Sequence, residues 1–121
     1  MAENHLPHNH FDKHNLTELA AQLDKTEDFQ TVSEVFKQLA DPNRVRIFWL
    51  LCHREECVIN IAVLVKMYTP AVSHHLRQLK TGGLIVSRRE GKEVYYKAAD
   101  TEAACLLHDA IEQMMAITCP Q

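Results

Sequence analysis

The sequence has few glycines and no long run of apolar residues. Three glycines and four prolines among 121 residues leave no low-complexity segment. A membrane-spanning helix needs about 20 consecutive apolar residues, and no stretch of this chain approaches that length. A basic N-terminal region followed by an apolar run, the mark of a secretion signal, is also missing. These absences predict a cytoplasmic, globular protein that does not enter a membrane.

The motifs of several large enzyme classes are missing as well. The sequence has no glycine-rich phosphate loop, no HExxH and no paired CxxC. Ser73 and His74 are adjacent, but neighbouring side chains on a helix diverge by about 100°, so they cannot form a nucleophile and its base. We therefore expect that the protein is not an enzyme.

Four cysteines are present: Cys52, Cys57, Cys105 and Cys119. A chain this rich in helix-forming apolar sequence needs no disulfide framework, so reduced thiols are expected. Cys105 and Cys119 are 14 residues apart, about 21 Å along one helix, and cannot pair within it. A thiol or redox response would have to join two chains, and it stays open as an alternative.

The charge is unevenly distributed along the chain. The net charge is −3, yet residues 37–97 contain 11 Lys and Arg against 5 Asp and Glu, and the segments on both sides are acidic. A basic segment on an acidic chain is typical of a nucleic-acid-binding face. A charged surface without a nucleic-acid partner, as in a protein-interaction module, is the alternative.

Helix signals follow one another from residue 28 onward. The segment 28–40 carries apolar residues at the spacing of one buried helical face: Val32, Val35, Phe36 and Leu39. Asp41 then caps a new helix, and Pro42 occupies its first position, where the missing N–H costs nothing. A short extended piece around Cys57-Val58 leads into a further helix.

The cap-and-proline signature returns at Thr69-Pro70 and opens a helix that Gly82-Gly83 ends. Two strands, 84–89 and 93–97, follow with a link short enough for a hairpin. The sequence therefore predicts a mainly α fold with a small β-hairpin, a winged helix-turn-helix. We expect one domain over residues 15–121 behind a flexible, His-rich arm, residues 1–14.

A short polar helix on an apolar scaffold fits the DNA major groove, and a cationic hairpin beside it suits the flanking phosphates. Double-stranded DNA is the predicted partner. The residues predicted to contact DNA are Thr69, Ser73, His74, Arg77, Lys80, Arg88, Arg89 and Lys92.

The last predicted helix, about 101–117, carries two apolar stripes. One stripe can pack on the domain, and the other can pack on a second copy of the chain. We therefore expect a homodimer that forms through terminal helices. The predicted interface residues are Leu107, Ala110 and Met114.

Several short motifs recur in one order: Ala40-Asp41-Pro42-Asn43-Arg44-Val45-Arg46-Ile47, Cys57-Val58, Ala71-Val72-Ser73-His74-His75-Leu76, Gly83-Leu84-Ile85 and Arg88-Arg89-Glu90-Gly91-Lys92-Glu93-Val94-Tyr95-Tyr96. Over roughly residues 28–117 the chain resembles the ArsR/SmtB family of winged helix-turn-helix repressors. The resemblance implies a homodimeric transcriptional repressor on an inverted-repeat operator, released by a metal ion or another signal. The chain departs from the family pattern at Lys66, Tyr68 and Pro70.

The resemblance also implies where a metal inducer would bind. The positions that ligate metal on the last helix of many members correspond to Asp100, Glu102, Gln113 and Ala116, and the last two cannot complete a tetrahedral zinc site. Other members combine a thiol with an N-terminal arm. That pattern predicts a site for zinc, cadmium or lead, and its ligands would be His5, His8, His10 and Cys57. Alternatives are a solvated arm, a merely buried Cys57, and an edge of the last helix formed by Cys105, His108 and Glu112.

Overall fold

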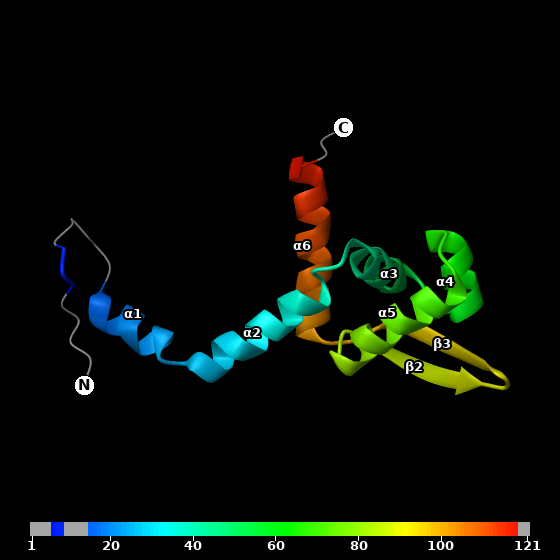
Figure 1. The fold of residues 1–121 in the computed structure, drawn as a ribbon, viewed down its shortest axis with the longest axis horizontal. Helices are drawn as coiled ribbons and strands as arrows, with labels where there is room; N and C mark the ends of the chain where they lie inside the picture. The colour runs from blue at the N-terminus through cyan, green and yellow to red at the C-terminus, as the bar shows by residue number, and fades with distance from the viewer. Residues whose placement is uncertain (1–5, 9–14, 119–121) are drawn as a thin grey trace. The chain divides into compact units, whose positions relative to one another are not determined.

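The computed structural model describes residues 6–8 and 15–118 (Figure 1). They belong to two compact units, which divide between Glu34 and Val35. The first unit contains helix α1 and the beginning of helix α2, and the second contains all the remaining elements. The domain boundary predicted at residue 14 falls outside the described residues.

Helices α1 (Leu16–Leu23) and α2 (Thr26–Gln38) bury none of their residues. Asn15 caps α1, because its side-chain oxygen accepts from the N–H groups of Thr17 and Glu18 at 2.9 and 3.3 Å. The buried face expected over 28–40 is formed only in part. Val32 is 50% exposed and Phe36 63% exposed, whereas Leu39, just after the end of α2, packs against the core. Most of the apolar face of α2 is therefore exposed, at Phe29, Val32 and Phe36.

Helix α3 (Pro42–His53) begins where the sequence predicts. The Asp41 carboxylate accepts from the N–H groups of Asn43 and Arg44 at 2.8 and 3.1 Å. The hydrogen bond from Arg44 is the main reason that the pKa of Asp41 is lowered. The Arg44 side chain in turn donates to the carbonyls of Lys37 and Gln38, the last residues of α2. One arginine therefore joins the end of α2 to the start of α3.

Helices α4 (Val58–Val65) and α5 (Thr69–Thr81) form the helix-turn-helix. Lys66, which follows α4, has a left-handed backbone with φ of +59°, and the chain then turns into α5. Helices α3, α4 and α5 enclose the core, and its largest fully buried side chains include Ile47, Phe48, Ile61, Val72, Leu76 and Leu79.

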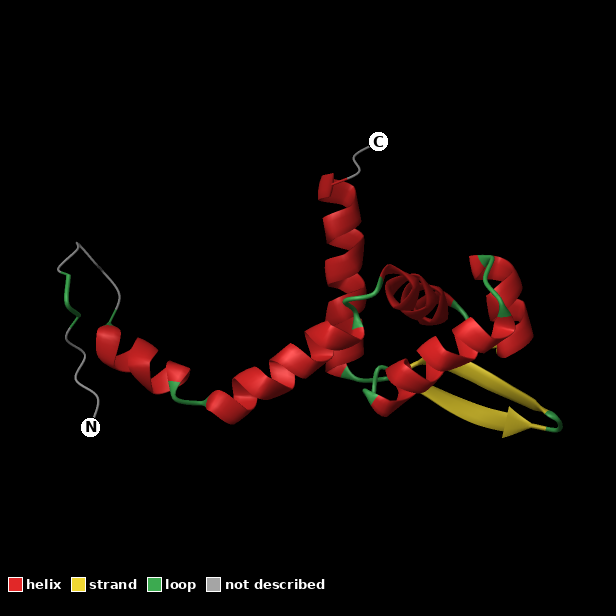
Figure 2. Cartoon of the chain, viewed as in Figure 1, coloured by secondary structure: helices red, strands yellow, loops and turns green. Residues whose placement is uncertain are grey.

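A three-stranded antiparallel sheet lies beside these helices, and Figure 2 shows its long hairpin in yellow. Strands β2 (Ile85–Glu90) and β3 (Glu93–Ala98) form the predicted hairpin, with Gly91 at φ of +63° in its turn. The extended piece expected near Cys57 is strand β1 (Glu56–Cys57), which pairs with β3. The wing is thus fastened to the segment that enters the helix-turn-helix.

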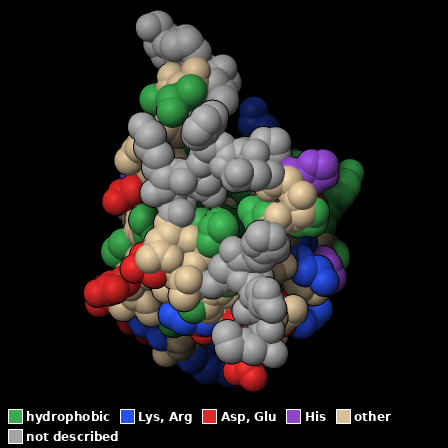
Figure 3. All heavy atoms as spheres, turned by 90° about the vertical axis from the view of Figure 1, so that its left-hand side faces the viewer, with side chains coloured by type: hydrophobic (Ala, Val, Ile, Leu, Met, Phe, Trp, Pro, Cys, Tyr) green, Lys and Arg blue, Asp and Glu red, His purple; other side chains and the backbone are tan. Residues whose placement is uncertain are grey.

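Helix α6 (Glu102–Thr118) packs on this core through Ala104 and Ile111, which are buried. Leu107 also packs against the core, whereas several large apolar side chains of α6 are exposed: Leu106, Met114, Met115 and Ile117. Figure 3 shows such exposed hydrophobic side chains among charged ones on one face of the molecule. Among the described residues, no helix has the length and apolar character that a membrane span requires.

Candidate nucleic-acid interface and a histidine cluster

Helix α5 has one buried side and one exposed side. Val72, Leu76 and Leu79 are at most 1% exposed and belong to the core. Of the residues predicted to read DNA on this helix, Ser73 is half-buried and the others are exposed: Thr69, His74, Arg77 and Lys80. The exposed side therefore offers a hydroxyl, an imidazole and two cations on a rigidly packed helix.

His75 follows His74 but belongs to the buried side. Within residues 6–8 and 15–118, its Nδ1 atom has no hydrogen-bond partner, and its Nε2 atom lies 4.0 Å from the Asp41 carboxylate. Burial lowers the pKa of His75, although the nearby Asp41 opposes the shift. The imidazole is therefore neutral at neutral pH, and it cannot add charge to the DNA-facing side.

The wing places its cations in different surroundings. Arg89 and Lys92 are exposed, and Arg89 donates to the Gly91 carbonyl at the turn. The Arg88 guanidinium instead donates twice to Glu55, at 2.8 and 2.9 Å, and once to Glu90, at 2.7 Å. These hydrogen bonds raise the pKa of Arg88 and lower that of Glu55. All three wing cations are exposed to solvent, but Arg88 alone is held by carboxylates of other described residues.

The predicted interface residues of α6 also differ in their surroundings. Met114 is exposed and Ala110 is half-buried. Leu107 packs against the core of its own chain, so it is the least available of the three for a partner.

The residues of the predicted arm site are only partly described. His5 and His10 lie outside the described residues, and His8 is an exposed residue of the first unit. Cys57 belongs to the second unit, where it precedes α4 at the cap position without a side-chain cap hydrogen bond. Its thiol is half-buried.

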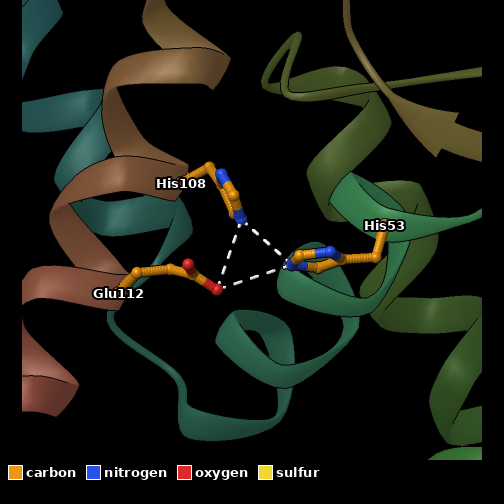
Figure 4. A group of neighbouring side chains, drawn as sticks. All are labelled: His53, His108 and Glu112. Atoms are coloured by element: carbon orange, nitrogen blue, oxygen red, sulfur yellow. Dashed lines mark hydrogen bonds and ion pairs between the residues drawn. The ribbon is translucent and has the colours of Figure 1, made fainter.

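A different set of ligand-type side chains meets between α3 and α6. Figure 4 shows His53, the last residue of α3, facing His108 and Glu112 of α6. The two Nε2 atoms are 3.0 Å apart, and each lies 3.5 Å from Oε2 of Glu112. The side chains of His53, His108 and Glu112 are 44%, 25% and 47% exposed, so the cluster is open to solvent. We call these three residues the HHE cluster.

Trp49 supports the HHE cluster from α3. Its indole N–H donates to Glu112 Oε2 at 2.8 Å, and its ring lies 4.4 Å from the His53 ring, centroid to centroid. The Trp49 hydrogen bond is the largest cause of a lowered pKa at Glu112, which is therefore a carboxylate at neutral pH. A single side chain thus positions two of the three members.

Two thiols lie in the adjoining cleft, which Cys52, His53, Cys105 and His108 help to line. Burial, together with the nearby Cys105, raises the pKa of Cys52 to about 11. A thiol with such a pKa is almost entirely protonated at neutral pH and reacts slowly. Cys52 is therefore poorly suited to a thiol response, whereas the thiol-response alternative concerns Cys105 and Cys119.

The sequence revealed two of the three members of the HHE cluster. His108 and Glu112 are visible as an i, i+4 pair on one helix, and the alternative drawn from the sequence combined them with Cys105. The third member is instead His53, which is 55 residues from His108 and belongs to another helix. No local pattern could have identified it.

Known proteins are similar to this chain in sequence and in fold. Residues 41–87 match the family described as "Bacterial regulatory protein, arsR family". A transcriptional repressor SmtB homolog from Synechocystis is 38% identical over 85 residues, which cover 70% of this chain and 64% of the relative. A cadmium resistance transcriptional regulatory protein CadC homolog from Staphylococcus aureus is 41% identical over 80 residues, covering 65% of this chain and 66% of the relative. The chain therefore spans slightly less than two thirds of these two relatives.

The fold has solved counterparts as well. The homodimeric winged helix-turn-helix DNA-binding domain Mb0332 from Mycobacterium bovis, described as a possible ArsR-family regulator, superimposes with a TM-score of 0.68. It is 35% identical, and the match covers 80% of this chain and 88% of that one.

Proposed function

Because the chain belongs to the ArsR family of bacterial regulatory proteins, we propose that it binds double-stranded operator DNA and represses transcription. The observation that carries this proposal is the division of α5, whose apolar side is fully buried while its polar and cationic side is exposed. A helix held in this way can enter the major groove without distorting its own core.

The residues proposed to face DNA divide into two roles. Ser73 and His74 are suited to contact base edges, because both carry hydrogen-bonding groups near the middle of the helix. Thr69, Arg77 and Lys80 neutralise or position phosphates, as do Arg89 and Lys92 on the wing. Arg88 acts through its ion pairs and holds the wing against the Glu55 segment.

We further propose that the protein acts as a homodimer. Apolar side chains of α6 such as Leu106 and Met114 are exposed, as are those of α2, and a second copy would cover them. The Mb0332 domain is homodimeric. Two copies related by a two-fold axis would read an inverted repeat.

We also propose that binding of a metal ion releases the protein from its operator DNA. One of the relatives is named for cadmium resistance. The Cys57 thiol together with His5, His8 and His10 offers donors suited to zinc, cadmium or lead. Cys57 lies immediately before α4, so a bond to it would act on the helix-turn-helix directly.

A gel shift across a salt series, on the DNA upstream of its own gene, tests the DNA-binding proposal. A repressor gives a discrete complex that weakens steeply with salt. His74→Ala should reduce the preference for the operator over random DNA, and Lys80→Ala should weaken both duplexes alike. If no duplex gives a complex, the chain is an interaction module instead. Loss of zinc-driven release in Cys57→Ser tests the metal site.

A further inference from the structure

We propose that the HHE cluster is a binding site for a divalent ion of the zinc class, which joins the end of α3 to α6 within one chain. This site shares no residue with the Cys57 and arm site. It does not depend on the proposed repressor function, because metal binding can be measured without DNA.

The distances within the cluster suit such an ion. A tetrahedral zinc ion bonded to nitrogen and oxygen at about 2.0–2.2 Å separates its ligand atoms by roughly 3.3–3.5 Å. The three separations in the cluster are 3.0, 3.5 and 3.5 Å. A circle through these atoms has a radius of about 1.9 Å, so an ion at bonding distance would lie slightly outside their plane. Almost no movement of the side chains is required.

The chemistry of the donors selects the ion. Two imidazoles and one carboxylate favour zinc, cobalt or nickel over magnesium or calcium, which prefer oxygen ligands. Glu112 supplies a negative charge that two neutral imidazoles lack. Because the cluster has three protein ligands and is open to solvent, water would occupy the fourth position.

Neighbouring side chains support the ligands, as the partners around a metal site do. Trp49 donates to Glu112 and contacts the ring of His53. The carboxylate of Asp109 lies 3.7 Å from Nδ1 of His108, the ring nitrogen that faces away from the cluster. Trp49 is therefore a positioning residue for two ligands, and Asp109 favours the tautomer of His108 that leaves Nε2 free for metal.

A cobalt titration of the reduced, full-length chain, in the absence of DNA, tests the site. The background carries Cys57→Ser and His5, His8 and His10 changed to Asn, so that the arm site cannot contribute. One equivalent of cobalt should bind with visible ligand-field absorption and no sulfur-to-cobalt charge-transfer band. His108→Ala and Glu112→Gln should each weaken binding by more than about 100-fold, the upper limit for losing an outer-shell partner. Trp49→Phe, which keeps a ring but loses the N–H, should weaken it about 10-fold.

His74→Ala is the matched control, because His74 is also a helical, exposed histidine but lies outside the cluster. It should bind cobalt as the background chain does. The proposal is overturned if the background chain binds no cobalt, if a thiolate band accompanies binding, or if both cluster variants retain full affinity. Helical circular dichroism of each variant separates loss of ligands from loss of fold.

Discussion

Arg88 and Arg89 are neighbours on β2, yet their surroundings give them different tasks. Arg88 is held by Glu55 and Glu90 and lies over the Tyr95 ring, 4.9 Å from its centroid. A phosphate would have to compete with two carboxylates for that guanidinium. Arg89 donates one 3.3 Å hydrogen bond to the Gly91 carbonyl, and no carboxylate of the described part of the chain pairs with it. At the scale of single residues, adjacency in sequence does not imply a shared role.

This difference predicts distinct salt dependences for DNA binding. Arg89→Ala should lower affinity for all duplexes and reduce the slope of log affinity against log salt by about one, because one phosphate contact is lost. Arg88→Ala should leave the slope unchanged and slightly loosen the wing. Fluorescence anisotropy across a salt series measures both. An equal fall in slope for the two variants would mean that Arg88 also contacts phosphate.

A second residue-scale prediction concerns His75 and acid. Burial lowers its pKa in the folded protein below the ordinary value of 6.5. The unfolded chain therefore takes up a proton at a higher pH than the folded chain, and stability is lost as the pH falls below about 6.5 toward the folded pKa. Thermal unfolding of His75→Gln should depend less on pH between 7 and 5, roughly, than that of the parent. His74→Gln, at the exposed neighbour, should keep the parent's dependence.

At the scale of elements, α6 combines an inward face with an outward one. Ala104 and Ile111 belong to the core, whereas Met114 and Ile117 are exposed. Leu107 contacts the core of its own chain, so a charge there would disturb the domain as well as any interface. Met114 is therefore a cleaner position at which to test association.

Met114→Glu should convert dimers to monomers while leaving the helix intact. A charge enclosed at an apolar interface without a partner typically costs several kcal/mol. Light scattering measures the mass, and operator affinity should fall in parallel. Gln113→Glu places the same charge at the adjacent exposed position and should remain dimeric. A dimeric Met114→Glu protein would place the interface elsewhere.

Local sequence signals predicted the elements well, because a helix start depends on a few consecutive residues. The Asp41-Pro42 start and the hairpin were predicted correctly, and α5 does begin at the Thr69-Pro70 segment. Thr69 is not its cap, however, because Tyr68 occupies the cap position and makes no side-chain cap hydrogen bond. Burial was harder to predict than the helices and strands. The apolar pattern of α2 indicates a face that favours burial, but it does not indicate which part of this chain or of a second copy would cover that face. The HHE cluster was hardest, because His53 meets His108 only after the whole core has formed.

At the scale of the whole molecule, the proposed metal site and the proposed DNA-binding surface are connected through α3. Its final residue belongs to the HHE cluster, and its Ile47 and Phe48 share the core with Leu76 of α5. An ion that fixes α3 against α6 can therefore change how readily α5 adopts its DNA-bound position.

If such coupling exists, it must be reciprocal. Zinc should change operator affinity by a factor in the usual range of about 5–150, and operator DNA should change zinc affinity by the same factor. Paired titrations of the Cys57→Ser chain, with and without the second ligand, measure both factors. His108→Ala should reduce each to one. Tight zinc binding with unchanged DNA affinity would mark the HHE site as purely structural.

The residue with a left-handed backbone between α4 and α5 of the helix-turn-helix limits the stability of the fold. Lys66 holds a backbone conformation that costs a side-chain-bearing residue roughly 1–2 kcal/mol, and glycine adopts it freely. Replacing Lys66 by glycine would remove this cost from the folded state. The greater conformational freedom of glycine in the unfolded chain would offset about 0.4–1 kcal/mol of the stability gained. A single substitution of Lys66 by glycine should therefore raise the thermal stability of the protein. It would not alter a residue proposed to contact DNA or metal.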